Sequence, residues 1–328
     1  MGGMLKPIVW TGEKVRLLDQ TQLPRQTVYV DIADAVQMHD AIRRLVVRGA
    51  PAIGVAAGFG AYLGISRGKR VDEVCDYLAT SRPTAVNLFW ALDRVRKIGA
   101  LGPSRVLDEC LTMLAEMEAT IQAIGEHGLS ALEGCSNVLT HCNAGALAGT
   151  GALAPMLIGH ERGRKFNVFV DETRPLLQGS RITAYELKES GVPVTLICDN
   201  MAAAVMAQKK VDACIVGADR IAANGDTANK IGTLSVAIAA KHFGVPFYVA
   251  APVSTIDFAC ASGTGIPIEQ RSADEVANFG AKPTAPEGVG VYNPAFDVTP
   301  AALITAIITE NGVARPPFEQ SLRSMMGR

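Results

Sequence analysis

The chain has 328 residues, of which 48% are hydrophobic, and its 31 basic and 32 acidic residues leave a formal net charge of −1. Few charges and many aliphatic residues exclude intrinsic disorder and predict a buried core. A net charge near zero gives no global basic field, so we expect neither a nucleic acid nor a membrane surface as a partner.

The N-terminal sequence MGGMLKPIVWTGEKVRLLD has no basic region leading into an apolar one, so we expect no secretory signal. The longest uncharged stretches, Gly49–Ser66 and Asn143–Gly159, are too short for a membrane helix. Seven cysteines without a CxxC pair predict neither a disulfide framework nor a zinc site. We therefore expect a cytoplasmic protein in a reducing compartment, with no bound metal.

The first part of the chain predicts a β-hairpin and a third strand, followed by helices. The strand-like runs are PIVW, KVRLLD and TVYVDI. Asp34 can cap the first helical segment, which stops near Gly49, and helical spacing then continues over 55–65, 71–80, 85–98 and about 104–132. Residues 1–133 are therefore predicted to form a domain of an N-terminal β-hairpin plus helices.

After Gly134, short β-rich runs alternate with helical ones. The predicted strands are SNVLTH, FNVFVD, VTLICD, DACIVG and PFYVAA, and the helices between them cover 146–158, 182–190, 201–209 and 230–242. This order is typical of βαβ units and predicts the α/β class, with a Rossmann-like parallel sheet and helices on both faces. The predicted C-terminal domain is 134–328, and its Pro/Gly-rich tail is expected to end in a short helix at 301–308.

Polar residues collect where four of these strands end. They are His141–Asn143, Asp171–Arg174, Asp199–Asn200 and Gly217–Arg220. Ligands of open α/β sheets bind outside the carboxyl ends of the strands. Four successive strand ends that carry an acid, a thiol or both therefore predict a functional site at this edge.

Cys142 is the most informative of these residues. It precedes a Gly-rich turn that runs into a predicted helix, whose N–H groups would stabilise a thiolate or bind an anion. The alternative is a small buried hydrophobe, which is our interpretation of Cys75, Cys110, Cys135 and Cys214. The pattern alone leaves both interpretations of Cys142 open.

Three further segments are candidates for anion binding. The run GADRIAANGDTANKIGT (217–233) interleaves polar and small residues, and Asn229-Lys230 is expected to open the next helix as part of a phosphate site. A hydrated, capped connection is the alternative. Arg48 in VVRGAPAIG and Arg82 in SRPTAVN stand before predicted helices and are weaker candidates on their own.

A dinucleotide-binding fold is the nearest rival. Asp171 ends the second predicted strand, where an acid that binds ribose would stand. The glycines at 145, 149 and 151 do not form the G-x-G-x-x-G fingerprint, however. We therefore expect no NAD and no other cofactor.

Eight sequence blocks together resemble the methylthioribose-1-phosphate isomerases, which are related to ribose-1,5-bisphosphate isomerases and to regulatory subunits of the initiation-factor-2B exchange factor. They span about residues 47–310 and are VRGAPAIGVAA, SRPTAVNLFWAL, LTHCNAGALA, DETRPLLQGSRITAYEL, TLICDNMAA, VGADRIAANGDTANKIGT, PFYVAAPVST and VYNPAFDVTP. The resemblance implies an enzyme that isomerises a 5-substituted ribose 1-phosphate, with neither metal nor cofactor.

The resemblance also implies roles for individual residues. The family's catalytic cysteine and aspartate correspond to Cys142 in THCNAG and Asp219 in GADR, which we expect to lie in a dry pocket. The related regulatory subunits lack this pair, so its presence favours an enzyme over a non-catalytic subunit. The substrate-contacting residues correspond to Arg48, Gly49, Ala50, Arg82, Gln178, Asn229 and Lys230.

Two expectations concern specificity and assembly. The resemblance implies 5-methylthioribose 1-phosphate as the substrate, with 5-deoxyribose 1-phosphate or ribose 1,5-bisphosphate as alternatives. The stretch between NAG and ALAP, next to Cys142, is shorter than is usual in the family, which keeps the 5-deoxy alternative open. The apolar run GVAAGFGAYLGI (54–65) offers more hydrophobic surface than one small layer buries, and we therefore expect a homodimer.

Overall fold

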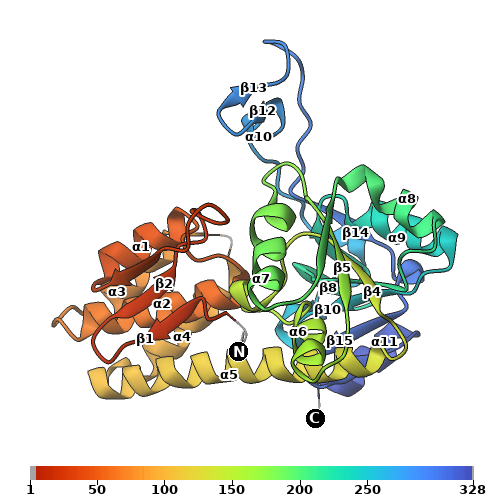
Figure 1. Cartoon of the computed structure of the whole chain (residues 1–328). Helices are drawn as coiled ribbons and strands as arrows, with labels where there is room; N and C mark the ends of the chain where they lie inside the picture. The colour runs from red at the N-terminus through yellow and green to blue at the C-terminus, as the bar shows by residue number, and fades with distance from the viewer. Residues whose placement is uncertain (1–4, 84, 327–328) are drawn as a thin grey trace. The chain divides into compact units, whose positions relative to one another are not determined.

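The computed structural model describes residues 5–83 and 85–326, which leaves Thr84 of the SRPTAVN motif and the first four residues outside the description. The chain divides into two compact units (Figure 1). The helical unit holds residues up to Gln122 together with Gly145–Thr150, and the α/β unit holds Ala123–Ala144 and everything from Gly151 onward. The change of unit falls inside the long helix α5 (Pro103–Ala131), whereas the sequence places a boundary at residue 133, after that helix.

The helical unit begins with a three-stranded antiparallel sheet in the order β1-β2-β3. The buried side chains Val15 and Leu17 alternate with the exposed Arg16, as one buried face requires. Trp10 at the end of β1 stacks on Phe59, with ring centroids 5.8 Å apart. The strands are β1 (Ile8–Trp10), β2 (Val15–Leu18) and β3 (Tyr29–Ile32).

The helices of this unit follow the predicted order. Asp34 caps the first of them, because its side chain accepts the Gln37 N–H at 2.8 Å. The second helix begins at Ala50, five residues before the predicted start, because Pro51 is well tolerated in a first turn. The elements are α1 (Ala35–Arg43), α2 (Ala50–Ile65), α3 (Val71–Ala79), α4 (Val86–Gly99) and the first part of α5.

Helix α2 is buried on all sides, and this overturns the reason for expecting a homodimer. Every residue from Ala52 to Ala61 is buried. A Cβ on Gly54 would lie 2.6 Å from the Asn87 carbonyl oxygen of α4, so glycine permits this close approach. The apolar surface of α2 is therefore consumed by packing inside the helical unit.

The α/β unit contains a seven-stranded sheet in the order β16-β15-β10-β7-β4-β5-β6, which confirms the predicted fold class. The five predicted strands are all parallel to their neighbours. The inner strands β7 and β10 are buried throughout, as expected where both faces are covered. The strands are β4 (Asn137–Thr140), β5 (Asn167–Asp171), β6 (Val194–Ile197), β7 (Ala213–Val216), β10 (Phe247–Ala250), β15 (Ala306–Thr309) and β16 (Gly312–Ala314).

The helix predicted at 301–308 is wrong. A single 3-10 turn at Ala301–Leu303 is followed by strand β15, which starts at Ala306 and runs parallel to β10, and β16 pairs with β15 in the antiparallel direction. The apolar run at 306–308 is too short for its periodicity to distinguish a buried strand from a helix. Pairing with β10, almost sixty residues earlier in the chain, decides the matter.

A second sheet of four strands, in the order β11-β8-β9-β14, corrects another expectation. Asn229 and Lys230 end strand β9 and do not open a helix. Gly232, with φ of +104°, separates this strand from α9 (Thr233–Phe243). The strands are β8 (Arg220–Ala222), β9 (Thr227–Lys230), β11 (Ile256–Asp257) and β14 (Phe296–Thr299).

The continuous helix predicted at 146–158 is also wrong. The segment forms a single 3-10 turn at Ala146–Ala148, and α6 (Ala154–Glu161) starts only after Gly149 and Gly151. Gly149 has φ of +73°, a conformation that ends the turn. Cys142 is therefore not followed directly by a helix N-terminus.

The other helices of the α/β unit are short. Helices α8, α9 and α11 pack their apolar residues against the seven-stranded sheet and form one continuous core. The segment with α10 and the β12–β13 hairpin extends away from the body of this unit (Figure 1). No helix in the described part of the chain is long and apolar enough to cross a membrane. The remaining elements are α7 (Ala184–Glu189), α8 (Ala202–Ala207), α10 (Asp274–Ala277), β12 (Asn278–Phe279), β13 (Lys282–Pro283) and α11 (Phe318–Met325).

Candidate active site

Cys142 lies just beyond the carboxyl end of β4 and is held by its backbone. Its side chain is buried, with 7% exposure. Its N–H donates to the Thr173 hydroxyl at 2.8 Å, and its carbonyl accepts the Thr183 hydroxyl at 2.5 Å. Thr173 follows β5 and Thr183 precedes α7, and both hold the backbone of Cys142. The position of the thiol is therefore set by the tertiary structure.

The backbone at Cys142 and Thr173 is strained. Both residues are left-handed, with φ of +65° and +63°, a conformation rarely adopted by residues other than glycine and least of all by β-branched ones. Thr173 is fixed by three contacts, since its N–H also donates to Asp199 at 2.7 Å and its hydroxyl to the Asp171 carbonyl at 3.0 Å. Strain that the surroundings over-determine is typical of functional sites.

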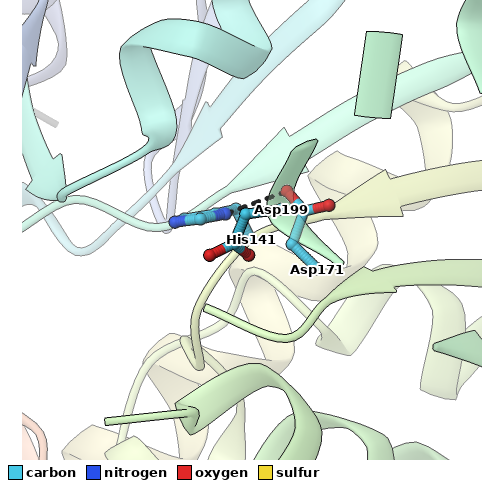
Figure 2. Close-up of side chains that lie close together, drawn as sticks. All are labelled: His141, Asp171 and Asp199. Carbon is cyan, nitrogen blue, oxygen red and sulfur yellow. Dashed lines mark hydrogen bonds and ion pairs between the residues drawn. The ribbon is translucent and has the colours of Figure 1, made fainter. Parts of the chain in front are cut away.

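His141, which precedes Cys142, bridges two other strand ends. Its Nδ1 lies 2.9 Å from Asp171 Oδ2 at the end of β5 (Figure 2). Its Nε2 lies 2.9 Å from the carbonyl oxygen of Ile231 after β9. His141 and Asp171 are 1% and 0% exposed. Burial alone lowers the pKa of His141, but the hydrogen bond and negative charge of Asp171 outweigh it, so the pKa is raised.

His141, Asp171 and Asp199 form the one group in the described chain whose side chains could together hold a metal ion. The sequence gives no metal-ligand spacing, because the three residues follow three different strands. Both ring nitrogens of His141 already face protein acceptors, and both oxygens of Asp199 accept backbone N–H groups of Thr173 and Arg174. These contacts describe a hydrogen-bonded network that engages both ring nitrogens and both oxygens of Asp199, whereas Asp171 Oδ1 is buried and has no hydrogen-bond partner among the described residues.

Asp219 lies in the loop between β7 and β8, and its N–H donates to the Ala228 carbonyl at 2.9 Å. Strands β4 and β7 are neighbours, so the loops carrying Cys142 and Asp219 leave adjacent strand ends. A Cβ on Gly217 would lie 2.4 Å from Ala144 Cβ, which shows how closely these loops approach. Asp219 itself is exposed, so the burial expected for both members of the pair is found only at Cys142.

Gln178 and Lys230 line a small pocket together with Arg271, Glu275 and Asn293. Gln178 is 7% exposed, and its Oε1 has no hydrogen-bond partner among the described residues. Lys230 Nζ donates to the Ala295 carbonyl at 3.0 Å and lies 4.5 Å from the centre of the Phe296 ring. A fixed ammonium and an unpaired buried amide oxygen suit a polar, anionic ligand.

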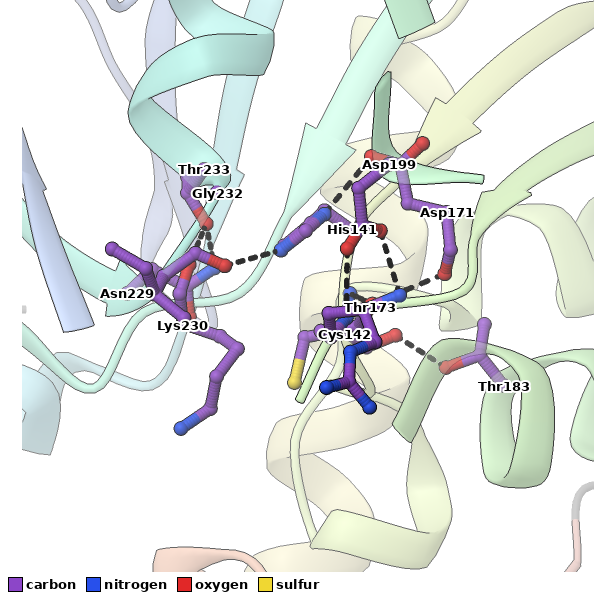
Figure 3. A network of polar contacts seen from close by, with 12 residues as sticks. His141, Cys142, Asp171, Thr173, Thr183, Asp199, Asn229, Lys230, Gly232 and Thr233 are labelled. Carbon is purple, nitrogen blue, oxygen red and sulfur yellow. Dashed lines mark hydrogen bonds and ion pairs between the residues drawn. The ribbon is translucent and has the colours of Figure 1, made fainter. Parts of the chain in front are cut away.

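Asn229 has a different environment from Lys230. Its amide donates to the Thr233 hydroxyl at 3.0 Å, and that hydroxyl donates to the Lys230 carbonyl at 2.7 Å (Figure 3). In this view the side chains of Cys142 and Lys230 extend to the same side of the network, away from His141. Asn229 therefore stabilises the turn that carries Lys230.

The other predicted substrate residues belong to the helical unit. Gly49, with φ of +88°, directly precedes α2, and a Cβ there would lie 2.0 Å from the Ala148 carbonyl oxygen. Ala50 is the first residue of α2, and the half-buried Arg48 stands before the turn. Arg82 is half-buried in the segment before α4. The expectation that Arg48 and Arg82 stand before helices is confirmed.

Sequence patterns assigned no role to the residues that hold the site together. Thr173 and Thr183 fix the backbone of Cys142, and Asp297 accepts the N–H groups of Gly232 and Leu234 at 2.8 and 3.1 Å. Asp171 and Asp199 could be recognised as polar residues at the ends of apolar strands. The local sequence carries no signal for their hydrogen-bond partners. Asp297, in the block VYNPAFDVTP, was marked only by the resemblance.

The chain is similar to known proteins over nearly its whole length. The initiation factor 2 subunit family matches residues 46–316. A methylthioribose-1-phosphate isomerase of Symbiobacterium thermophilum is 54% identical, covering 97% of this chain and 94% of its own. A 5-deoxyribose 1-phosphate isomerase of Moorella thermoacetica is 53% identical, covering 98% of this chain and 97% of its own.

Solved structures are similar over the same length. A 5-methylthioribose 1-phosphate isomerase from Pyrococcus horikoshii has a TM-score of 0.93 and 41% identity, with 98% of this chain and 96% of that one covered. A protein described as translation initiation factor eIF-2B, subunit delta, from A. fulgidus has a TM-score of 0.89 and 40% identity, with 99% and 100% covered. From this similarity and the shared fold, the chain belongs to the initiation factor 2 subunit family and, within it, to the group that contains the methylthioribose-1-phosphate isomerases.

Proposed function

We propose that the protein is an aldose–ketose isomerase that converts 5-methylthio-α-D-ribose 1-phosphate into 5-methylthio-D-ribulose 1-phosphate, a step of methionine salvage. Relatives with this name match nearly the whole chain at about half identity. The observation that supports the proposal most strongly is the strained, buried Cys142, gripped by Thr173 and Thr183 beside the loop of Asp219. Such a placement favours chemistry over packing.

The reaction needs two proton-transferring groups. Because the phosphate occupies the anomeric carbon, the sugar ring must open with the ester in place, after which a hydrogen moves from C2 to C1. The ring oxygen gains a proton and the C2 hydroxyl loses one, so the net change is an isomerisation. We assign these transfers to Cys142 and Asp219, which are a thiol and a carboxyl on adjacent strand ends.

The substrate contacts follow the same proposal. Lys230 is assigned to the phosphate, because its ammonium is fixed at the pocket that also contains the unpaired Gln178 oxygen. Asn229 supports the turn of Lys230. Arg48 and Arg82 are proposed as phosphate-binding cations, and Gly49 and Ala50 as the backbone contacts beside them.

The 5-substituent is the feature on which relatives differ. Relatives at 53% and 54% identity are named for 5-deoxyribose 1-phosphate and for methylthioribose 1-phosphate, respectively. A ribose 1,5-bisphosphate is the third candidate within the same chemistry. All three keep the anomeric phosphate and the C2 hydrogen, so Cys142 and Asp219 would serve each of them alike.

A substrate panel tests the function directly. The protein is incubated with ribose 1-phosphates that carry a 5-methylthio, 5-deoxy, 5-hydroxy or 5-phospho group, and ketose formation is followed by NMR. We expect the highest kcat/KM with the methylthio compound. A higher kcat/KM with the deoxy compound would make 5-deoxyribose 1-phosphate the substrate and would leave the proposed reaction unchanged.

A non-catalytic subunit is the alternative from another class, and the likeness to the protein described as subunit delta of eIF-2B favours it. That alternative predicts no ketose from any compound of the panel. It also predicts that replacing Cys142 changes nothing but packing.

We further propose a cytoplasmic homodimer. All seven cysteines lie in the described chain and none forms a disulfide there, which suits a reducing compartment. Strand β6 is an edge of the large sheet with Leu196 51% exposed, and Met201 nearby is 45% exposed. An open edge with exposed apolar side chains is a natural place for a second copy.

Light scattering at micromolar concentration tests the assembly. We expect twice the monomer mass for the wild type and a shift toward the monomer for Leu196→Glu. Tyr292→Glu is the matched control, because Tyr292 is an exposed hydrophobic residue (80%) far from this edge in the chain. A monomeric wild type would contradict the proposal.

A further inference from the structure

We propose that His141 is a positioning residue that acts as a doubly protonated imidazolium, clamping the loop of Cys142 to the ends of β5 and β9. The inference rests on the proposed function, because its consequence is measured on the reaction assigned to Cys142. His141 is neither a member of the catalytic pair nor one of the residues assigned to substrate binding.

The geometry of the ring requires two donors. The carbonyl oxygen of Ile231 can only accept, so Nε2 must carry a proton to make its 2.9 Å contact. Asp171 Oδ2 lies 2.9 Å from Nδ1 at the end of a strand that is buried on both sides. Burial raises the pKa of Asp171, and the contact with His141 opposes this shift. An ionised Asp171 only accepts, and in that state Nδ1 is protonated too and the ring carries a charge.

The charges around the ring favour this state. Asp171 and Asp199 both raise the pKa of His141 against the opposing effect of burial, and the half-buried Asp297 of β14 interacts with the same ring. Glu172 and the thiol of Cys214 are the other titratable groups that face Asp171. One buried imidazolium therefore lies against the buried Asp171, with half-buried carboxylates around the pair.

The His141 ring is also closely packed against the elements that it joins. A Cβ on Gly232 would lie 2.8 Å from the ring, so the turn after Lys230 packs directly on His141. Cys142 is the next residue in the chain, and its left-handed backbone depends on Thr173, whose hydroxyl donates to the Asp171 carbonyl. Loss of the clamp should therefore misplace the thiol.

Two variants distinguish the effect of the charge on the His141 ring from the effect of the ring itself. His141→Gln removes the ring, whereas Asp171→Asn keeps two hydrogen bonds, because an amide can donate to Nδ1 of a neutral ring. We expect kcat to fall by about 10²-fold in His141→Gln, since a misplaced catalytic group costs this much, and by a smaller factor in Asp171→Asn, which keeps the hydrogen bonds and loses only their charge. KM should change little, because β9 is held independently by its pairing with β8 and β14.

The control is His127→Gln. His127 belongs to the same unit and makes one ring contact of 2.9 Å, to the Thr309 carbonyl. We expect its kcat to equal that of the wild type. A normal kcat in folded His141→Gln would overturn the positioning role, and a normal kcat in Asp171→Asn would overturn the need for a charged ring.

Two readouts do not depend on turnover. Nitrogen-15 NMR of the wild-type protein should show both ring nitrogens of His141 protonated at pH 7 to 8, and a single protonated nitrogen there would overturn the charged state. The rate of alkylation of Cys142, measured by peptide mass spectrometry, should change in His141→Gln while that of Cys135, at the other end of β4, does not. An equal rate at Cys142 would contradict the clamp.

These readouts also separate this inference from the proposed function. If no ribose 1-phosphate is isomerised by the wild type, the function fails. The NMR and alkylation results still decide whether His141 is a charged clamp.

Discussion

Helix α2 in the helical unit and the strand-end network in the α/β unit are equally buried but are built in opposite ways. In α2, Ile53 and Phe59 are 1% and 0% exposed, and glycines allow neighbouring helices to approach closely. In the network, His141 and Asp171 are 1% and 0% exposed, and their polar atoms are joined by a hydrogen bond between opposite charges. Burial by itself therefore does not separate packing from chemistry.

The two regions should also respond differently to substitution. Apolar side chains such as Ile53 and Phe59 stabilise by ~1.5–3 kcal/mol each when fully buried, and steric mismatch there lowers stability. Polar groups at the strand ends contribute little net stability, but they determine where Cys142 lies. Changes in α2 should therefore affect the free energy of unfolding, and changes in the network should affect turnover.

The largest effect is expected at the catalytic pair. Cys142→Ser and Asp219→Asn should each lower kcat by ~10²–10⁴-fold, because a hydroxyl or an amide cannot replace the proton transfer. Since both residues act in one step, the double variant should be little worse than the poorer single variant. Turnover and melting temperature are measured together on all three proteins. Near-normal turnover in folded Cys142→Ser would end its assignment as catalytic.

The next effect concerns the phosphate. Lys230→Ala should weaken substrate binding by ~1.5–3 kcal/mol, roughly tenfold to a hundredfold, through loss of a charge-assisted contact. Isothermal titration with substrate and with inorganic phosphate measures both affinities. Lys241→Ala, an exposed lysine of α9, is the matched control and should bind normally. Unchanged affinity for both ligands in Lys230→Ala would remove this residue from the phosphate site.

A pair of glycines tests the packing of α2. A Cβ on Gly54 would lie 2.6 Å from a backbone oxygen of α4, whereas one on Gly58 would lie 2.5 Å from the terminal methyl of Met113, which can move. Gly54→Ala should therefore lower the free energy of unfolding by ~1–3 kcal/mol through overpacking. Gly58→Ala should be nearly neutral, and denaturant titration compares the two. An equal loss of unfolding free energy in both variants would mean that the backbone of α4 moves aside as easily as the Met113 side chain.

The smallest effect is a pH dependence outside the site. Burial opposes ionisation of Asp226, but the N–H groups of Ala301 and Gly263 and the amide of Asn224 outweigh it and lower the pKa of its carboxyl. Its stabilising contribution is therefore present above the unfolded value of 3.8 and is lost as pH falls through the lower folded value. This carboxyl tests whether polar contacts away from the site still affect stability.

Asp226→Asn checks this sign. The variant should be less stable than the wild type near neutral pH by ~1 kcal/mol, and the difference should shrink as the pH falls below 3.8. Denaturant titrations at several pH values measure the difference, with the exposed Asp274→Asn as the control. A difference that grows toward acid pH would contradict the assigned sign.

The sequence by itself determined the long helices and the order of the main strands. Helices α3, α4 and α5 lie within a few residues of their predicted bounds, because their apolar spacing extends over several turns. The five predicted strands alternate with helical segments, and this order specifies a parallel sheet. The positions of Cys142 and Asp219 at strand ends follow from the same order.

Only the tertiary structure decided the short segments and the partners of the polar residues. The segment at 306–309 is a strand because β10 pairs with it, and Lys230 ends a strand because β8 and β14 flank β9. The contacts of His141 with Asp171 and Ile231 join residues 30 and 90 positions apart. Hydrogen-bond partners at such separation leave no periodic trace in the sequence, because they depend on which strands become neighbours.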